Sequence, residues 1–385
     1  MPRRNIRRNK QFTMPPNPPR LLALDVFRGA TIALMILVNT PGSWSAVFAP
    51  FLHAPWHGCT LTDLVFPNFL FIVGVSLYFS LSKYDYRVSG AAFGKIAKRT
   101  ALIFLVGVLL NWFPFFHQNI AELRIHGVLQ RIALAYGLAA TLVLLVPRKR
   151  WPLTIAALLL LYWAVLYFGG GADPYGKEDN LKRLVDLATV GPDHMYGGFG
   201  LPFDPEGLLG MISGAATALI GAYVGCLIRS RPERTDLVKD MLLIGLGLIL
   251  AGRIWDNFFP INKPLWTSSY VCYAGGIATC VLAVCIELID ARGHRRWTRP
   301  FVQFGTNPLA VYVFSGVLVK LAIHVFRWEN AAGESVNLYG WLWKNVYSAA
   351  IPFPKVASLM FALSVVFVCW LLAAWLYRRK VFIKL

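Results

Sequence analysis

Ten long apolar segments divide the chain, and short stretches of polar residues separate them. They cover about 21–39, 62–81, 99–115, 127–146, 151–168, 207–228, 238–257, 265–287, 301–325 and 357–377. Each is close to the roughly 20 residues that a helix needs to cross a bilayer. The pattern predicts an all-α polytopic membrane protein with about ten transmembrane helices. A further short amphipathic helix is expected near residues 338–347.

The basic residues support this count, because they alternate between the two sides of the predicted membrane. With the N-terminus inside, 26 of the 38 Lys and Arg fall on the inner side and 8 on the outer side. This asymmetry is typical of cytoplasmic loops and places both termini in the cytoplasm. Residues 1–20 are expected to form a disordered basic cytoplasmic tail. Residues 21–385 are expected to form one transmembrane domain, whose long outer loop, 169–206, is rich in turn residues. The net charge of +19 is spread over short loops, which argues against a nucleic-acid partner.

The loop after the first segment carries unusual chemistry for a simple connection. Between Asn39 and Asp63 it has no Lys or Arg, but it holds His53 and His57. A neutral imidazole can take a proton from an amine or act as a nucleophile, and Asp63 is a candidate for orienting it. The alternative is that His53 is a solvated loop histidine. Two histidines four apart suit a metal only on a helix, and no third ligand is evident, so no metal is expected.

Polar residues from several other segments fall at the same predicted outer depth. We therefore expect a pocket there, formed between helices. Its catalytic candidates are His53, Asp63 and Asn39. Its substrate-binding candidates are Trp56, His57, Gln130, Arg131, Asp204, Glu206, Asp256 and Trp266. Structural alternatives stay open, since Arg131 can pair with a carboxylate and Asp204 and Glu206 can cap the helix that follows them.

Several of these stretches resemble a known family. They include LDVFRG (24–29), LHAPWHG (52–58), TDLVFPNFLFIVG (62–74), FDPEGLLG (203–210) and GTNPLAVYV (305–313). They are similar to the heparan-α-glucosaminide N-acetyltransferase family, and most of all to its bacterial, NagX-type transmembrane glucosamine N-acetyltransferases. Compared with the lysosomal enzyme, the chain is expected to lack an N-terminal lumenal domain and its first anchor helix, and it has His57 where that enzyme has Asn. A free aminosugar or a short oligosaccharide is therefore the expected acceptor.

The resemblance implies an enzyme of the bacterial inner membrane that uses acetyl-CoA as co-substrate to acetylate the amine of glucosamine. It gives the essential role to His53, which either carries the acetyl group or acts as a base. Asp63 would fix its tautomer, and Asn39 would bind the carbonyl oxygen. Cofactor-binding candidates at the inner side are Arg28, Lys95, Lys98 and Arg99, although Arg28 has an alternative as the ion-pair partner of Asp25. Two other functions remain open: a transporter for a sugar or cell-envelope fragment, and an envelope glycan O-acyltransferase. A homodimer also remains open.

Overall fold

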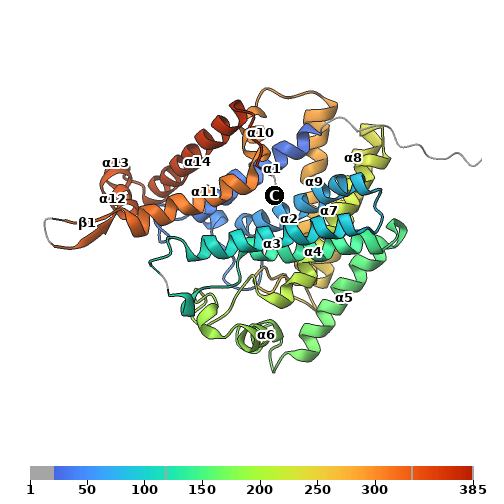
Figure 1. Cartoon of the computed structure of the whole chain (residues 1–385), viewed down its shortest axis with the longest axis horizontal. Helices are drawn as coiled ribbons and strands as arrows, with labels where there is room; N and C mark the ends of the chain where they lie inside the picture. The colour runs from blue at the N-terminus through green and yellow to red at the C-terminus, as the bar shows by residue number, and fades with distance from the viewer. Residues whose placement is uncertain (1–20, 118, 331–332, 384–385) are drawn as a thin grey trace, which may run out of the picture.

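Helices form at all ten predicted positions (Figure 1). The computed structural model describes residues 21–117, 119–330 and 333–383, so the predicted tail, 1–20, lies outside the described residues. The long helices are α1 Leu22–Asn39, α2 Leu61–Leu81, α3 Gly90–Trp112, α4 Val128–Leu145, α5 Trp151–Gly169, α7 Met211–Ser230, α8 Arg234–Trp255, α9 Ser268–Cys285, α10 Arg299–Thr306 with α11 Pro308–Lys320, and α14 Pro354–Arg378. The predicted all-α class is confirmed.

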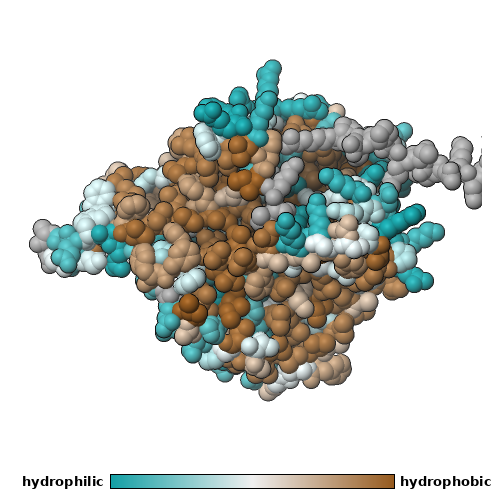
Figure 2. Space-filling model, in the orientation of Figure 1, coloured by the Kyte–Doolittle hydropathy of each residue, from teal (hydrophilic) through white to brown (hydrophobic). Residues whose placement is uncertain are grey.

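Eight helices of the described part of the chain are long and apolar enough to cross a membrane. The predicted segments at α3 and α8 are not among them. Both helices carry several charged residues in their first halves, such as Lys95 and Lys98 in α3 and Asp236 and Lys239 in α8. Hydrophobic residues cover most of the centre of one face of the molecule, while hydrophilic residues gather along its upper and right-hand edges (Figure 2). Such a surface suits a membrane protein, whose apolar band faces lipid.

The ninth predicted segment, 301–325, is not one helix, which corrects the prediction. It breaks at Asn307, because a residue before proline avoids the helical region and Pro308 starts a new helix. The buried Asn307 side chain donates to the Val381 carbonyl at 2.9 Å and accepts from the Ile383 amide at 2.8 Å. The break therefore binds the C-terminal segment.

The centre of the bundle depends on close helix packing. Helices α2 and α7 touch through Gly74 and Gly221, where an added Cβ would collide with the backbone carbonyls of Ala218 and Phe71. Small residues at such crossings let membrane helices approach closely. This contact holds α2, which begins at the loop that carries His53.

The two long outer segments contain more structure than turns. In 169–206 a short helix, α6 Leu181–Thr189, was not predicted, and it lies apart from the main bundle (Figure 1). In the last outer loop an antiparallel hairpin, β1 Arg327–Glu329 and β2 Ser335–Asn337, leads into α12 Leu338–Leu342, a π-helical turn and α13 Ser348–Ala350. The predicted short helix near 338–347 is confirmed. The remaining short elements are 3-10 turns at Ala49–Phe51, Ser82–Tyr84, Ile120–Glu122, Arg148–Arg150, Pro192–His194 and Leu208–Gly210, and π turns at Ile286–Ala291, Leu321–Val325 and Trp343–Tyr347.

Candidate active site

A cavity of about 580 Å³ joins the loop before α2 to the loops around α6 and before α9. This volume lies in the range usual for small-molecule sites, roughly 300 to 1,000 Å³. The residues in its wall that carry polar or aromatic groups are Asn39, Trp44, His53, Thr62, Asp63, Phe66, Arg124, Lys177, Tyr196, Phe199, Glu206 and Lys263. All three predicted catalytic residues are therefore brought together, and Glu206 joins them.

Asp63 is fixed at the start of α2 by the way this helix is capped. Its Oδ2 accepts hydrogen bonds from the Ala54 amide and from the amide and hydroxyl of Thr60, each at 3.0 Å. A carboxylate at the third helical position that bonds back to the N-cap residue is a usual way to begin a helix. Its side chain is 2% exposed. Capping thus immobilises the carboxylate and leaves Oδ1 for another partner.

That partner is His53, whose Nδ1 lies 2.6 Å from Asp63 Oδ1. An ionised carboxylate only accepts hydrogen bonds, so Nδ1 carries the proton and donates it. The lone pair of the neutral ring is therefore on Nε2. Because the His53 side chain is 47% exposed and lines the cavity, this nitrogen is available to a bound molecule. The arrangement is that of an oriented base or nucleophile.

Lys263 completes this wall, and the sequence did not predict it as a site residue. Its Nζ lies 3.2 Å from His53 Nδ1, 3.4 Å from His53 Nε2 and 3.7 Å from Asp63 Oδ1. An atom this close to both ring nitrogens cannot lie in the ring plane without striking Cε1, so the amine lies over the ring face. Burial lowers the pKa of Lys263, and the Asp63 carboxylate opposes this only in part. In the sequence Lys263 looked like one of the few ordinary outer charges.

Arg124 forms a second wall of the cavity with two carboxylates, and the sequence did not predict this role either. Its Nε and Nη2 each donate to Asp204 at 2.8 Å, and Nη2 also donates to Glu206 Oε2 at 2.6 Å. Burial alone would lower the pKa of Arg124, but its hydrogen bonds to Asp204 and the charge of Glu206 raise it above its usual value. Burial would raise the pKa of Asp204, but the bonds from Arg124 lower it. Asp204 is fully buried, so only Glu206 and Arg124 reach the cavity.

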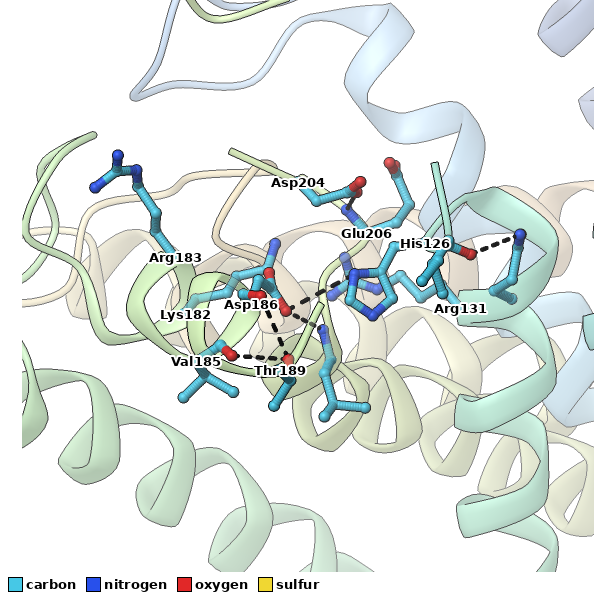
Figure 3. A network of polar contacts seen from close by, with 12 residues as sticks. His126, Arg131, Lys182, Arg183, Val185, Asp186, Thr189, Asp204 and Glu206 are labelled. Carbon is cyan, nitrogen blue, oxygen red and sulfur yellow. Dashed lines mark hydrogen bonds and ion pairs between the residues drawn. The ribbon is translucent and has the colours of Figure 1, made fainter. Parts of the chain in front are cut away.

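A second layer of buried charges, which includes Arg131 and Lys182, supports this wall (Figure 3). Arg131 donates to the carbonyls of Pro205 and Gly210, and its guanidinium lies 4.2 Å over the Trp266 ring. Lys182 of α6 donates to Pro205 at 2.7 Å and also to the carbonyl of Pro264. Burial lowers the pKa of Lys182 to about 7. Lys182 thus ties the Glu206 loop to the Lys263 loop. Arg131 lies behind the cavity wall.

The remaining substrate-binding candidates do not line the cavity. Trp56 donates to the Tyr175 carbonyl at 2.9 Å and packs on Phe199 and Phe203. His57 Nδ1 is 3.3 Å from the Asn262 amide. Gln130 donates to Ile125 at 2.9 Å, Asp256 accepts from Ile261 at 2.7 Å, and Trp266 donates to Thr217 at 3.1 Å. These side chains hold the loops that form the walls.

None of the four cofactor-binding candidates lines this cavity. Arg28 pairs with Asp25 at 3.1 Å and donates to Ser76 at 2.7 Å and to the Gly305 carbonyl at 3.2 Å. This is the ion pair that the sequence offered as its alternative role. On α3, Lys95 and Lys98 are exposed and Arg99 lies 4.8 Å over the Tyr136 ring. Within the described ranges, no group of three or more His, Cys, Asp or Glu could hold a metal ion.

Comparison with known proteins agrees with the motifs. Residues 20–171 match the family model described as heparan-alpha-glucosaminide N-acetyltransferase, catalytic. The chain is 30% identical over 437 residues to the Homo sapiens heparan-alpha-glucosaminide N-acetyltransferase, a match that covers 96% of this chain. It is 28% identical over 432 residues to the Mus musculus protein of the same name, with 95% of this chain covered. The chain spans 60% of the length of each of these relatives. The predicted family resemblance is thereby confirmed.

Proposed function

We propose that this chain belongs to the heparan-alpha-glucosaminide N-acetyltransferase family and that it transfers the acetyl group of acetyl-CoA to the amine of glucosamine or of a glucosamine-containing saccharide. The observation that carries the proposal is the His53–Asp63 pair, 2.6 Å apart in the wall of a cavity large enough for a sugar. The pair lies inside the stretch that matches the catalytic model of the family.

The acetyl transfer needs a nitrogen that removes a proton, and His53 Nε2 supplies it. An aminosugar is protonated in water, and its nitrogen attacks a thioester only as the neutral amine. In direct transfer, Nε2 takes the amine proton while the new C–N bond forms and the C–S bond breaks. In the alternative, Nε2 first accepts the acetyl group and then passes it to the amine. Asp63 orients the ring in both cases. Asn39 and Lys263 are the neighbouring donors for the oxygen on which negative charge develops.

Aromatic side chains at the cavity suit a sugar ring. Trp44, which is 60% exposed, Tyr196 and Phe199 all line it, beside the polar groups of Glu206 and Lys177. Apolar sugar faces pack on such rings, while a few charged groups fix the orientation. Because Arg124 is already neutralised by Asp204 and Glu206, the cavity has no large excess of positive charge. This favours a neutral or aminosugar acceptor over a highly sulfated polymer.

The nucleotide end of acetyl-CoA would lie outside this cavity. We assign it to the basic inner side, with Arg28, Lys95, Lys98 and Arg99 as candidate contacts, so that the thioester arm reaches His53 between the helices. This direction of entry follows from the predicted topology, with both termini in the cytoplasm. It fits a place in the inner membrane of a bacterium and in the bacterial branch of the family.

The test uses the purified full-length protein in detergent with labelled acetyl-CoA. We expect labelled N-acetylglucosamine from glucosamine, and no label in N-acetylglucosamine supplied as the acceptor, which lacks a free amine. Release of CoA with no labelled sugar from any aminosugar would contradict the acceptor assignment. If the protein in vesicles moved sugar without consuming acetyl-CoA, it would be a transporter and the proposal would be wrong.

A further inference from the structure

Lys263 brings a second primary amine to the place where acetyl groups are to be transferred. Its Nζ lies within 3.4 Å of both His53 ring nitrogens, and the residue lines the same cavity. The reaction proposed above joins an acetyl group to an amine beside this imidazole. The protein thus carries a built-in amine next to the imidazole that acts on the acceptor amine.

The Lys263 loop is held firmly, so this proximity is a property of the fold. On one side of Lys263, Asn262 accepts from the Leu265 amide at 2.7 Å, and its own amide donates to Thr267 Oγ1 at 3.0 Å. On the other side, the Pro264 carbonyl accepts from the buried Lys182. Gly58 of the histidine loop donates to Ile261 at 2.7 Å, which links the two loops directly. These bonds therefore hold the loop that carries the Lys263 amine next to the loop that carries the His53 imidazole.

We propose that Lys263 is a self-acetylation site, modified when acetyl-CoA is bound and no acceptor amine occupies the cavity. The inference rests on the proposed function, because it uses the same acetyl donor and the same base. The neutral Nζ attacks the thioester carbonyl carbon, so that a C–N bond forms and the C–S bond breaks. The flexible Lys263 side chain turns from the ring face to the edge where the Nε2 lone pair lies, and His53 Nε2 takes the proton from the amine and returns it to the CoA thiolate. The products are Nε-acetyllysine at position 263 and CoA thiol.

Two features favour this reaction over acetylation at other lysines. Burial lowers the pKa of Lys263, so a larger fraction of its amine is neutral than at an exposed lysine. A reacting group held beside its partner also behaves as if it were highly concentrated. Modification would remove the positive charge beside Asp63 and place an acetyl group over the His53 ring. We therefore expect the modified protein to lose activity, and a bound aminosugar to protect it.

The experiment measures the modification itself by mass spectrometry. Purified full-length protein in detergent is incubated with isotope-labelled acetyl-CoA, with and without saturating glucosamine, and chymotryptic peptides are quantified over time. Lys177 is the internal control, because it lines the same cavity and has no hydrogen bond to His53 among the described contacts. We expect at least about tenfold more label on Lys263 than on Lys177. Glucosamine should lower the label on Lys263, and His53→Ala should reduce it to the Lys177 level.

The same tubes are analysed for labelled N-acetylglucosamine, which separates the two proposals. Equal label on both lysines, or label on Lys263 that His53→Ala leaves unchanged, would overturn the inference. So would an absence of label on Lys263 in the tubes without glucosamine when the tubes with glucosamine yield labelled N-acetylglucosamine, and in that case the proposed function would stand. Label on Lys263 without acetylated glucosamine would support self-acetylation and reject the acceptor. If neither product formed, the proposed function would fail and this inference with it.

Discussion

The two walls of the cavity are built from similar charged groups but use them differently. In the His53 wall, both His53 and Lys263 line the cavity, and His53 is about half exposed. His53 Nε2 and the Lys263 amine can therefore still form hydrogen bonds with a bound molecule. In the Arg124 wall, the guanidinium is already bound by Asp204 and Glu206 through three hydrogen bonds. The buried Arg131 and Lys182 support that wall from behind. On the proposed function, we infer that the first wall carries the chemistry, while the second holds the shape of the cavity.

Replacing His53 with Ala should have the largest effect on activity and almost none on the fold. The ring is exposed enough that little packing is lost. The loss of a general base lowers the rate by about 10² to 10⁴, and the loss of a covalent carrier should lower it further. Acetylation of glucosamine and thermal unfolding of the detergent-solubilised protein are measured together. A variant that turns over like the wild type would show that the chemistry lies elsewhere.

Arg124→Met should show the opposite pattern to His53→Ala: its main effect should be a lower free energy of unfolding, not a direct loss of the chemical step. It leaves the fully buried Asp204 carboxylate without its partner, and breaking a buried ion pair in this way costs about 3 to 5 kcal/mol. Thermal unfolding measures the loss. The matched control is the double variant Arg124→Met with Asp204→Asn, which removes the unpaired charge and should recover part of the stability. If the single variant unfolded at the wild-type temperature, the Arg124–Asp204 pair would not stabilise the fold.

Asp63→Asn tests whether orientation of His53 matters beyond the helix cap. Asparagine keeps the size and can still accept from Thr60, so stability should change little. The carboxylate that accepts the His53 Nδ1 proton and fixes the orientation of the ring is lost, and we expect turnover to fall about 10²-fold. Binding of acetyl-CoA, measured by calorimetry, should be mostly kept. An unchanged turnover would show that Asp63 only caps α2 and does not contribute to catalysis.

The sequence predicts one wall better than the other for physical reasons. Asp63 and His53 are only ten residues apart in the chain, and Asp63 is also the residue that caps α2. Both residues can therefore be recognised within one loop of the sequence. Arg124 and Asp204 are 80 residues apart in the chain, and nothing local distinguishes Arg124 from other outer charges. Lys263 is missed for the same reason. Hydropathy predicts the helix positions because burial in lipid requires long apolar runs. It does not predict the break at Asn307, because the segment on each side of the break is apolar.

Acid pH should weaken the Arg124 wall, because the Asp204 carboxylate in it becomes protonated. The pKa of Asp204 is lower in the folded protein than its ordinary 3.8, because Arg124 donates to it. The carboxylate therefore contributes stability that is fully present above that ordinary value and is lost as the pH falls through the lower, folded value. Unfolding temperatures of wild type and Asp204→Asn are compared as the pH is lowered below about 4. The difference between the two proteins should shrink with falling pH, and a constant difference would contradict the ion-pair explanation.

The smallest effect should come from His57, the other histidine of the same loop. It does not line the cavity, and its Nδ1 lies 3.3 Å from the Asn262 amide nitrogen, outside the His53–Asp63 pair. Burial lowers the pKa of His57, so the ring is neutral and serves as an acceptor for the loop that carries Lys263. His57→Ala removes that contact and should lower turnover by a few-fold at most, since a single neutral hydrogen bond contributes roughly 1 kcal/mol. His57→Asn restores an acceptor and should recover the wild-type rate. The contrary result would be a loss of turnover in His57→Ala as large as that in His53→Ala, with no recovery in His57→Asn. It would mean that catalysis depends on both histidines of the loop and not on His53 alone.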